Sequence, residues 1–316
     1  MITNQKDTQK KLVVGIGSAL VDILAHEDDD FLAKTRAVKG GMKYVDREFI
    51  ELAVSQTSKK PTIMPGGSAC NTVIGIGRLG GAARFVGKSG NGEMARLFET
   101  DLKNSNVDPA LFKSPSPTGR VLSIITPDAQ RSMLTFLGAA SETQPKEITE
   151  NCFENAAIVH IEGYLLFNED LIMAALKGAK AAGALVSLDL ASFTVVEASK
   201  TLLKKIVKDF VDILIANEDE AKTFTGHGDE IKAVRSLSEN TEIAILKIGE
   251  RGSIISHDGK IINIEAIGTR AAVDTTGAGD LWASGFLFGL VNGYGLEKCG
   301  ELGSACGYEV CQVVGA

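Results

Sequence analysis

The residues best suited to chemistry lie in one short stretch near the end of the chain, residues 274–280, which spell DTTGAGD. The residues after Asp280 are mostly apolar, as in a buried helix. A glycine-rich turn that leads into a helix points several unpaired backbone N–H groups at one place, with the positive end of the helix dipole behind them. Such a turn binds anions, most often phosphate. A carboxylate beside it is unfavourable unless it takes up a proton during the reaction, so we expect Asp280 to act as a general base.

The elements that would position this turn follow a regular pattern in the second half of the chain. Short apolar runs predict strands at 158–161, 185–188, 213–216, 243–248 and 253–256. Helical windows separate the first four of these runs, at 168–182, 195–208 and 228–239. Strand–helix alternation implies a parallel sheet with helices on both faces. An earlier apolar run, residues 12–19, predicts another buried parallel strand, with Asp22 at its carboxyl end, where such sheets place their ligands.

One pair of predicted strands does not fit this alternation. Residues 121–126 and 132–137 are rich in β-forming residues and are joined by a turn at 127–130, which predicts a hairpin. Because no helix is attached to it, we expect the hairpin to leave the main sheet. The chain contains no linker long or polar enough to separate two folding units, so we predict one domain over residues 1–316 with a small β appendage.

Two segments spell nucleotide-binding motifs in the wrong context. Residues 75–80 match G-x-G-x-x-G, but they lie well inside a helix predicted from Ser68 to about Leu79, whereas a dinucleotide fingerprint must join a strand to the start of a helix. Helix packing explains these glycines better. Residues 87–89 resemble the end of a P-loop, but Ala82 occupies the position of the required first glycine. We therefore predict neither a dinucleotide fold nor a P-loop.

The DTTGAGD stretch resembles the signature of the PfkB/ribokinase family of small-molecule kinases, and similar segments lie at 66–71 and 217–220. The resemblance covers nearly the whole chain, residues 12–316. It implies a ribokinase-like three-layer α/β/α sandwich with a mainly parallel central sheet. It also implies a small β-sheet lid, formed by about 24–46 and 118–138, that excludes water from the reaction.

The resemblance also assigns the catalytic groups. It implies that Asp280 takes the proton of the acceptor hydroxyl, while the backbone amides of Gly277, Ala278 and Gly279 hold the moving phosphate. Asn217 and Glu220 match an N-x-x-E motif that orders Mg²⁺ through water, which suits an ion that keeps most of its hydration shell. An ordinary acidic first turn of a helix is the alternative explanation of that motif.

Further family positions concern the phosphate donor and a cation. The contacts expected for ATP come from Lys247, Gly249, Gly252 and Thr275. Asp274 and Thr276 match positions that bind a monovalent cation, such as K⁺, through oxygen ligands. Asp189 stands at a strand end where relatives often carry asparagine, and a carboxylate that faces phosphate would repel it.

The acceptor side is expected to hold the vicinal hydroxyls of a sugar ring. The family positions for this role are occupied by Asp22, Gly66, Gly67 and Asn71. A carboxylate and an amide accept and donate across a diol, and glycines let the backbone approach. Arg131, in the hairpin, either reaches the transferring phosphate or is solvated.

Within the family the chain is most similar to the adenosine kinase-like branch. Two positions depart from it, because Ser18 replaces an asparagine of eukaryotic adenosine kinases and Glu162 is typical of ribokinases. Both are counted among the substrate-binding candidates, and they leave a free sugar open as the acceptor. Four side chains either face a nucleobase or form the core of the small sheet: Met42, Tyr44, Met133 and Phe136.

Composition limits the other classes of function. The 316-residue chain is 44% hydrophobic, which is ample for a core, and its net charge of −7 argues against binding the nucleic-acid backbone. Five scattered cysteines without metal-ligand spacing favour a reducing compartment. The polar N-terminus lacks the apolar core of a signal peptide, and no run approaches the ~18 apolar residues of a membrane span. We expect a cytoplasmic protein that binds no membrane; a homodimer stays open.

These observations predict an ATP- and Mg²⁺-dependent kinase that phosphorylates the primary hydroxyl of a nucleoside, with adenosine favoured. A kinase for a free sugar such as ribose or fructose is the enzymatic alternative. A nucleoside-binding sensor that kept the fold but lost turnover is the non-catalytic alternative, and the intact Asp280 argues against it.

Overall fold

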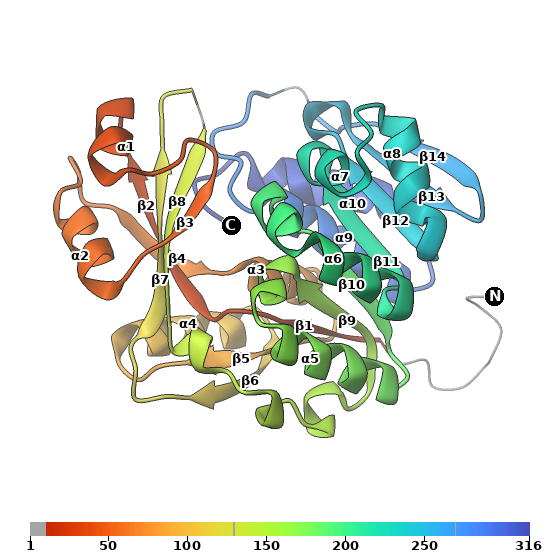
Figure 1. Cartoon of the computed structure of the whole chain (residues 1–316), viewed down its shortest axis with the longest axis horizontal. Coiled ribbons are helices and arrows are strands. Elements are labelled where there is room, and N and C mark those ends of the chain that lie inside the picture. The colour runs from red at the N-terminus through yellow and green to blue at the C-terminus, as the bar shows by residue number, and fades with distance from the viewer. Residues whose placement is uncertain (1–10, 129, 269) are drawn as a thin grey trace.

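The computed structural model describes residues 11–128, 130–268 and 270–316, which form two sheets (Figure 1). Within this part of the chain the larger sheet has nine strands in the order β14-β13-β12-β11-β10-β9-β1-β5-β6. Pairing is parallel from β12 to β6 and antiparallel only at β12–β13 and β13–β14. The strands are β1 Leu12–Ile16, β5 Ala83–Ser89, β6 Val107–Lys113, β9 Ala156–Glu162, β10 Leu185–Asp189, β11 Ile213–Asn217, β12 Ile243–Lys247, β13 Ser253–His257 and β14 Lys260–Ile264.

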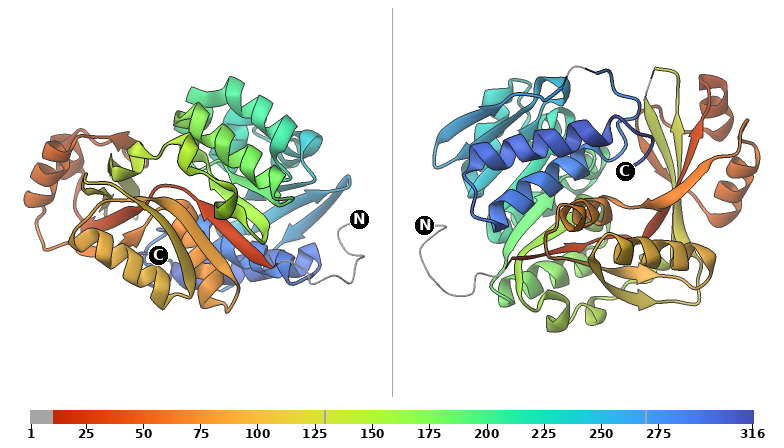
Figure 2. Two further views of the ribbon diagram at one scale, coloured as in Figure 1. Left: turned by 90° about the horizontal axis from the view of Figure 1, so that it is seen from below. Right: turned by 180° about the vertical axis from the view of Figure 1, so that it is seen from behind.

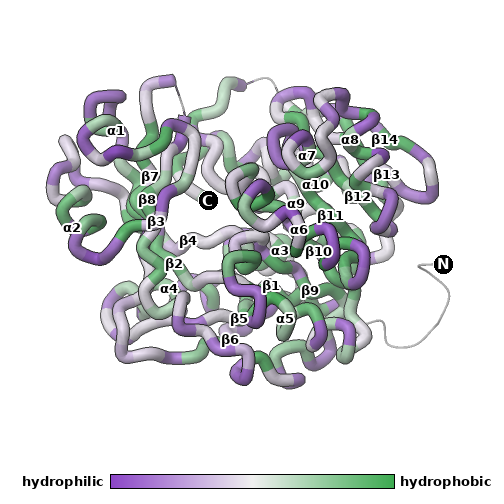
Figure 3. Tube along the Cα trace, viewed as in Figure 1, coloured by the Kyte–Doolittle hydropathy of each residue, from purple (hydrophilic) through white to green (hydrophobic). Residues whose placement is uncertain are grey.

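Helices cover both faces of this sheet because its strands are apolar on both faces. In β11, Leu214 packs into one core and Ile213 and Ile215 into the other. The first core is closed by α5 Glu169–Ala181, α6 Phe193–Phe210, α7 Glu218–Thr225 and α8 Glu230–Leu237. The second is closed by α3 Ser68–Arg78, α4 Glu93–Asn104, α9 Ala278–Val291 and α10 Leu296–Val310. Figure 2 shows α9 and α10 on the face opposite to the green helices, and Figure 3 shows hydrophobic residues along the central strands. The predicted three-layer α/β/α sandwich is confirmed.

The smaller sheet stands beside the carboxyl ends of the main strands. Its order is β3-β8-β7-β2-β4. The strands are β2 Leu20–His26, β3 Met42–Tyr44, β4 Thr62–Gly66, β7 Thr118–Ile125 and β8 Arg131–Gly138. Two helices, α1 Asp29–Thr35 and α2 Arg47–Ser55, pack on one face over a small core that includes Phe31 and Ile50. The other face is turned toward the main domain (Figure 1).

The hairpin predicted from sequence is confirmed as the antiparallel pair β7–β8, and it lies outside the main sheet. The prediction of a single strand over residues 12–19 was wrong in its extent. Strand β1 ends at Ile16, and the chain then crosses to the smaller sheet as β2. Asp22 therefore lies inside β2 rather than at the end of a main-sheet strand. The smaller sheet also includes β4, which no sequence signal indicated.

The two segments that spell nucleotide-binding motifs lie in a helix and in a strand, as expected. The first four residues of the 75–80 segment lie in α3. A side chain at Gly75 would overlap Ser284 of α9, and a side chain at Gly77 would overlap the carbonyl of Ser105. These glycines allow α3 to pack closely against its neighbours. Lys88 lies within β5 and forms a buried ion pair with Glu147, at 2.7 Å, so there is no phosphate loop at this position. No helix among the described residues is long and apolar enough to cross a membrane.

Candidate active site

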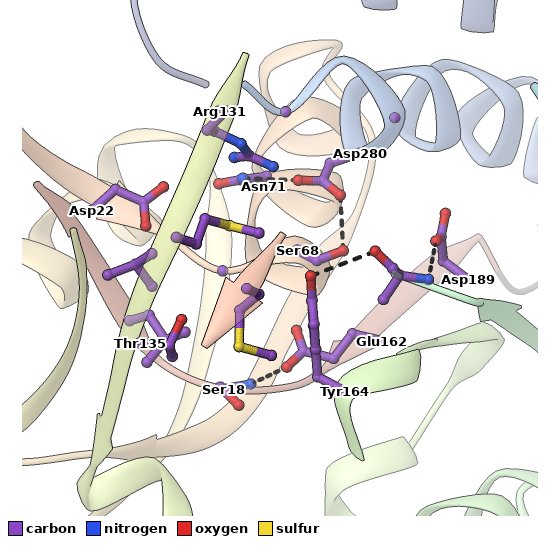
Figure 4. A pocket seen from close by; sticks show the side chains of 18 of the residues that line it. Ser18, Asp22, Ser68, Asn71, Arg131, Thr135, Glu162, Tyr164, Asp189 and Asp280 are labelled. Atoms are coloured by element: carbon purple, nitrogen blue, oxygen red, sulfur yellow. Dashed lines mark hydrogen bonds between the residues drawn. The ribbon is translucent and has the colours of Figure 1, made fainter. Parts of the chain in front are cut away.

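A cavity of about 210 Å³ lies between the smaller sheet and the main sheet (Figure 4). Four neighbouring strands of the main sheet, β9 to β12, end at this cavity in polar residues: Glu162, Asp189, Asn217 and Lys247. The carboxyl ends of parallel strands meet at one edge of a sheet, so residues far apart in sequence converge there. The N-terminus of α9 and the first turn of α3 complete this side of the cavity.

Asp280 faces the cavity from the first turn of α9. Its carboxylate accepts hydrogen bonds from Ser68 Oγ at 2.8 Å and from Asn71 Nδ2 at 2.9 Å, and both donors also border the cavity. Burial raises the pKa of Asp280, the two hydrogen bonds lower it, and the charge of Asp189 raises it again; the net effect is a pKa above the ordinary value. A carboxylate with a raised pKa and an open side toward a cavity suits a general base.

Within the described residues, two of the three backbone amides predicted to bind phosphate are free in the anion turn, those of Gly277 and Gly279, whereas that of Ala278 is already hydrogen-bonded. Gly277 has a φ of 72°, which favours glycine, and α9 begins directly after it. The N–H of Ala278 donates to the carbonyl of Thr275 at 3.2 Å, whereas the N–H groups of Gly277 and Gly279 have no hydrogen-bond partner among the described residues. A Cβ at Gly279 would stand 2.8 Å from the ammonium nitrogen of Lys247. The free amides, the helix dipole and this lysine together favour an anion here.

The predicted acceptor residues lie together at this cavity. Asp22 and Asn71 are buried yet border it, as does Gly67, which has a φ of 100°. Gly66 packs directly against the Asp22 carboxylate, where any side chain would overlap it. Burial raises the pKa of Asp22 to about 7, against the opposing charge of Arg131. Arg131 reaches into the cavity from the start of β8 (Figure 4).

Glu162 closes the bottom of the cavity. It is 1% exposed and accepts hydrogen bonds from the backbone N–H groups of Ser18, at 2.8 Å, and Ala69, at 3.1 Å. Burial raises its pKa to about 7, although both hydrogen bonds act to lower it. Gly17 is required here, because a side chain would overlap the carboxylate. Glu162 therefore joins the β1–β2 connection to α3 while it faces the acceptor site.

The smaller sheet gives the cavity an apolar wall. Its side chains are Leu20, Met42, Tyr44, Val121, Met133 and Leu137. Of the four aromatic and methionine candidates, three therefore border the cavity: Met42, Tyr44 and Met133. Phe136 is the exception, because residues alternate along β8: Met133, Thr135 and Leu137 face the cavity, whereas Phe136 packs on the small core.

A second cavity of about 850 Å³ lies on the other side of the anion turn, against α9 and α10. Gly249, Gly252 and Thr275, all predicted donor contacts, border it. At its margin Trp282 Nε1 and Ser304 Oγ are buried without a hydrogen-bond partner among the described residues. Five residues border both cavities: Asn217, Lys247, Thr275, Ala278 and Gly279. The two cavities thus meet at the anion turn, as transfer between two bound substrates requires.

Comparison with known proteins agrees with this geometry. The sequence model described as pfkB family carbohydrate kinase matches residues 34–316. The chain belongs to the pfkB family. The solved structure of adenosine kinase from Sinorhizobium meliloti superposes with a TM-score of 0.91 and 32% identity, covering 97% of this chain and 95% of that one. A probable sugar kinase from Rhizobium etli CFN 42 gives 0.93 and 31%, covering 98% and 95%.

A plant protein supports the same family from sequence alone. Probable fructokinase-7 of Arabidopsis thaliana is 28% identical over 267 residues, which is 79% of this chain and 76% of that protein. PfkB kinases transfer a phosphoryl group to a hydroxyl of a sugar or nucleoside. The predicted family and the predicted enzyme class, a phosphotransferase with an alcohol acceptor, are confirmed. Membership of this family implies the use of ATP.

In this pfkB kinase the N-x-x-E residues form a helix cap. Both carboxylate oxygens of Glu220 accept from Asn217, from its backbone N–H at 2.8 Å and its side-chain amide at 2.7 Å, and Asn217 Oδ1 accepts from the Glu220 N–H at 3.0 Å. Burial and the charge of Asp189 raise the pKa of Glu220 to about 8. The alternative explanation, an acidic first turn of a helix, therefore describes the local structure of α7. Glu220 also borders the acceptor cavity.

The residues expected to bind a monovalent cation form a buried turn. Asp274 accepts hydrogen bonds from the backbone N–H of Thr276, at 2.9 Å, from its hydroxyl, at 2.7 Å, and from the N–H of Gly315, at 2.9 Å. This network holds the start of the anion turn against the C-terminal segment of the pfkB kinase. No group of three or more His, Cys, Asp or Glu side chains is placed to hold a metal within the described residues.

Several site residues of this pfkB kinase were missed in the sequence. Ser68 lies one helical turn before Asn71 on α3, a spacing that places both on one face and could have indicated it. Alternation along β8 could have indicated Thr135 and Leu137. Nothing in the sequence indicated the polar groups of Trp282 and Ser304, because α9 and α10 are brought together only by tertiary packing.

Proposed function

We propose that this pfkB kinase phosphorylates the primary hydroxyl of a nucleoside, with adenosine favoured. The observation that carries the proposal is the division of the acceptor cavity into a polar end and an apolar wall. Asp22, Asn71 and Asp280 suit the ribose, whereas the methionines and Tyr44 offer a surface on which a nucleobase can stack. A free sugar carries hydroxyl groups on most sides and would leave that apolar surface unused.

The proposed chemistry assigns a task to each side of the cavity. Asp22 and Asn71 hold the ribose hydroxyls, so that the primary hydroxyl lies against Asp280. Asp280 removes its proton, a contribution of roughly 10²–10⁴-fold. The N–H groups of Gly277 and Gly279, with Lys247, stabilise the charge on the moving phosphoryl group. Preorganised donors of this kind are often the largest contribution to catalysis.

The second cavity fits the ATP that supplies the phosphoryl group. Its two buried unpaired atoms, Trp282 Nε1 and Ser304 Oγ, are suited to the polar edge of a nucleobase, since such atoms otherwise cost free energy. Asn217 and Glu220 would order Mg²⁺ through water at the junction of the cavities. The turn around Asp274 and Thr276 would hold K⁺ through carbonyl and side-chain oxygens, and the hydrogen bonds between these two residues fix its shape.

The smaller sheet is proposed to act as a lid. Tyr44 on β3 contacts Phe167 of the main domain edge to face, with ring centroids 5.7 Å apart. Tyr44 also borders the cavity, so this contact joins the cavity wall to the main domain. Closure excludes water, which would otherwise compete with the acceptor for the phosphoryl group.

A free-sugar kinase is the second candidate. It is favoured by Glu162, whose buried carboxylate faces the cavity at the position where ribokinases carry glutamate, and by the similarity to a probable fructokinase.

The main experiment is therefore a coupled assay of ADP release with adenosine, inosine, cytidine, ribose and fructose. We expect the highest kcat/KM with adenosine. A higher kcat/KM with ribose or fructose than with every nucleoside would refute the nucleoside proposal.

Binding provides a check that does not depend on turnover. A ligand present at 100 times its Kd stabilises a protein by ~2.7 kcal/mol. Thermal unfolding with the same five compounds should therefore show the largest increase in Tm with adenosine. An increase with ribose alone would move the assignment to sugar phosphorylation.

A further inference from the structure

Asp189, which forms a buried ion pair with Lys247 at the junction of the two cavities, has no role in the proposed phosphoryl transfer. Asp189 ends β10 and Lys247 ends β12, and the strand between them, β11, ends at Asn217. The carboxylate Oδ2 of Asp189 lies 2.8 Å from the Lys247 ammonium, and the two side chains are 6% and 15% exposed. The other carboxylate oxygen accepts from the N–H of Ala191 at 2.9 Å, which fixes the orientation of the carboxylate.

The ammonium of Lys247 is placed where the phosphoryl group must pass. Lys247 borders both cavities, and its nitrogen would stand 2.8 Å from a Cβ on Gly279 in the anion turn. Burial lowers the pKa of Lys247, but the nearby carboxylates of Asp189, Glu220 and Asp280 raise it by more. The net pKa lies above the ordinary value, so the side chain stays protonated. A cation is thus held beside amides that are suited to phosphate.

We infer that Asp189 is a positioning residue, which holds the Lys247 ammonium at the junction of the two cavities so that it contacts an oxygen of the transferring phosphoryl group. Lysine has a flexible four-carbon stem and needs an anchor to keep one position. A charge-assisted hydrogen bond supplies that anchor before the substrates bind. Positioning of this kind lowers the barrier because the ordering is complete before the reaction begins. It also explains why a carboxylate is tolerated near phosphate, since the lysine neutralises it.

A purely structural role, in which the pair only ties β10 to β12, predicts a different result from a double-mutant cycle. The variants are Asp189→Asn, Lys247→Met and the double variant, each measured for kcat and for KM of ATP. If Asp189 acts through Lys247, Asp189→Asn lowers kcat by about 10-fold in the native background and by less than about 2-fold in the Lys247→Met background. KM for ATP changes less than kcat, because the contact is made mainly during transfer.

The control variant is Lys180→Met, which removes an ion pair with Asp212 outside both cavities. It should leave kcat unchanged, and thermal unfolding of each variant identifies any loss of folded protein. Equal effects of Asp189→Asn in both backgrounds would overturn the inference. So would a rise in kcat in Asp189→Asn, since that would show the carboxylate opposing the phosphate.

The inference uses phosphoryl transfer rather than the proposed preference for nucleosides. The cycle is run with whichever acceptor the wild-type protein turns over, so failure of the nucleoside proposal leaves it testable. A second measurement needs no turnover: labelling by an amine-reactive reagent, followed by mass spectrometry. Lys247 should be labelled several-fold faster in Asp189→Asn than in the wild-type protein, and ATP should protect it in the wild type. Equal labelling rates would contradict an anchoring role.

Discussion

Replacement of Asp280 by asparagine removes the proposed base with little change of shape. In the native protein one oxygen accepts from Ser68 Oγ and the other from Asn71 Nδ2. An asparagine can keep both contacts, because its oxygen can face Asn71 while its amide donates to the Ser68 hydroxyl, which can also accept. The fold and the cavity should therefore be preserved, and the loss should be confined to proton transfer.

The expected magnitude follows from that loss. General-base catalysis contributes roughly 10²–10⁴-fold, which corresponds to a barrier higher by about 2.7–5.4 kcal/mol at 1.36 kcal/mol per factor of ten. We expect kcat for Asp280→Asn to fall by this factor, while KM for ATP changes little. The assay is ADP release with the best acceptor, together with the increase in Tm caused by ATP.

A small effect on kcat would exclude this role for Asp280. If purified Asp280→Asn retained kcat within about 3-fold of the wild type, Asp280 would not be the base. The stability measurement separates a genuine loss of kcat from misfolding, since a folded variant should keep the wild-type Tm shift with ATP.

Three further predictions concern neighbouring side chains. Ser68→Ala removes a hydrogen bond that lowers the pKa of Asp280, so the pKa of this carboxyl should rise in the variant. The acid limb of the kcat/KM profile should then move to higher pH, because the base must be ionised. An unshifted acid limb would contradict this. Burial raises the pKa of Asp22 from 3.8 to about 7, so its contribution to stability should decline as pH rises from about 4 to 7. Asp22→Asn should therefore be more stable than the wild type at pH 8, by on the order of 1–4 kcal/mol, but not at pH 4. Denaturant unfolding at both pH values measures this difference. Met133→Ala should raise KM for adenosine about 10-fold without raising that for ribose, whereas Phe136→Leu, on the opposite face of β8, should leave both unchanged; equal effects of the two variants would argue against a nucleobase wall.

The sequence indicated the architecture because the signals for it are local. Apolar runs separated by helical windows predicted the strands β9 to β13 and helices between them, and two β-rich runs joined by a turn predicted the β7–β8 hairpin. The extent of the smaller sheet was not predictable in the same way. Only three residues separate β1 from β2, so the apolar pattern runs through the point where the chain changes sheets.

The catalytic stretch was recognisable because its chemistry is contained in seven consecutive residues, 274–280. The position of a glycine turn relative to the following helix is fixed by local backbone geometry, so the anion site and its carboxylate could be identified without a structure. Asn217 and Glu220 could also be identified from local sequence, since their mutual hydrogen bonds span only one helical turn.

Tertiary structure alone decided what surrounds these residues. The contact of Ser68 with Asp280 joins residues 212 apart, and the ion pair of Asp189 with Lys247 joins residues 58 apart across an intervening strand. Such contacts depend on the register of parallel strands and on the close approach of α3 and α9, which no local pattern encodes. The sequence alone therefore predicted the turn that would bind phosphate and the carboxylate that would remove a proton. Sheet register and helix packing decided which side chains orient those groups and how the two cavities meet.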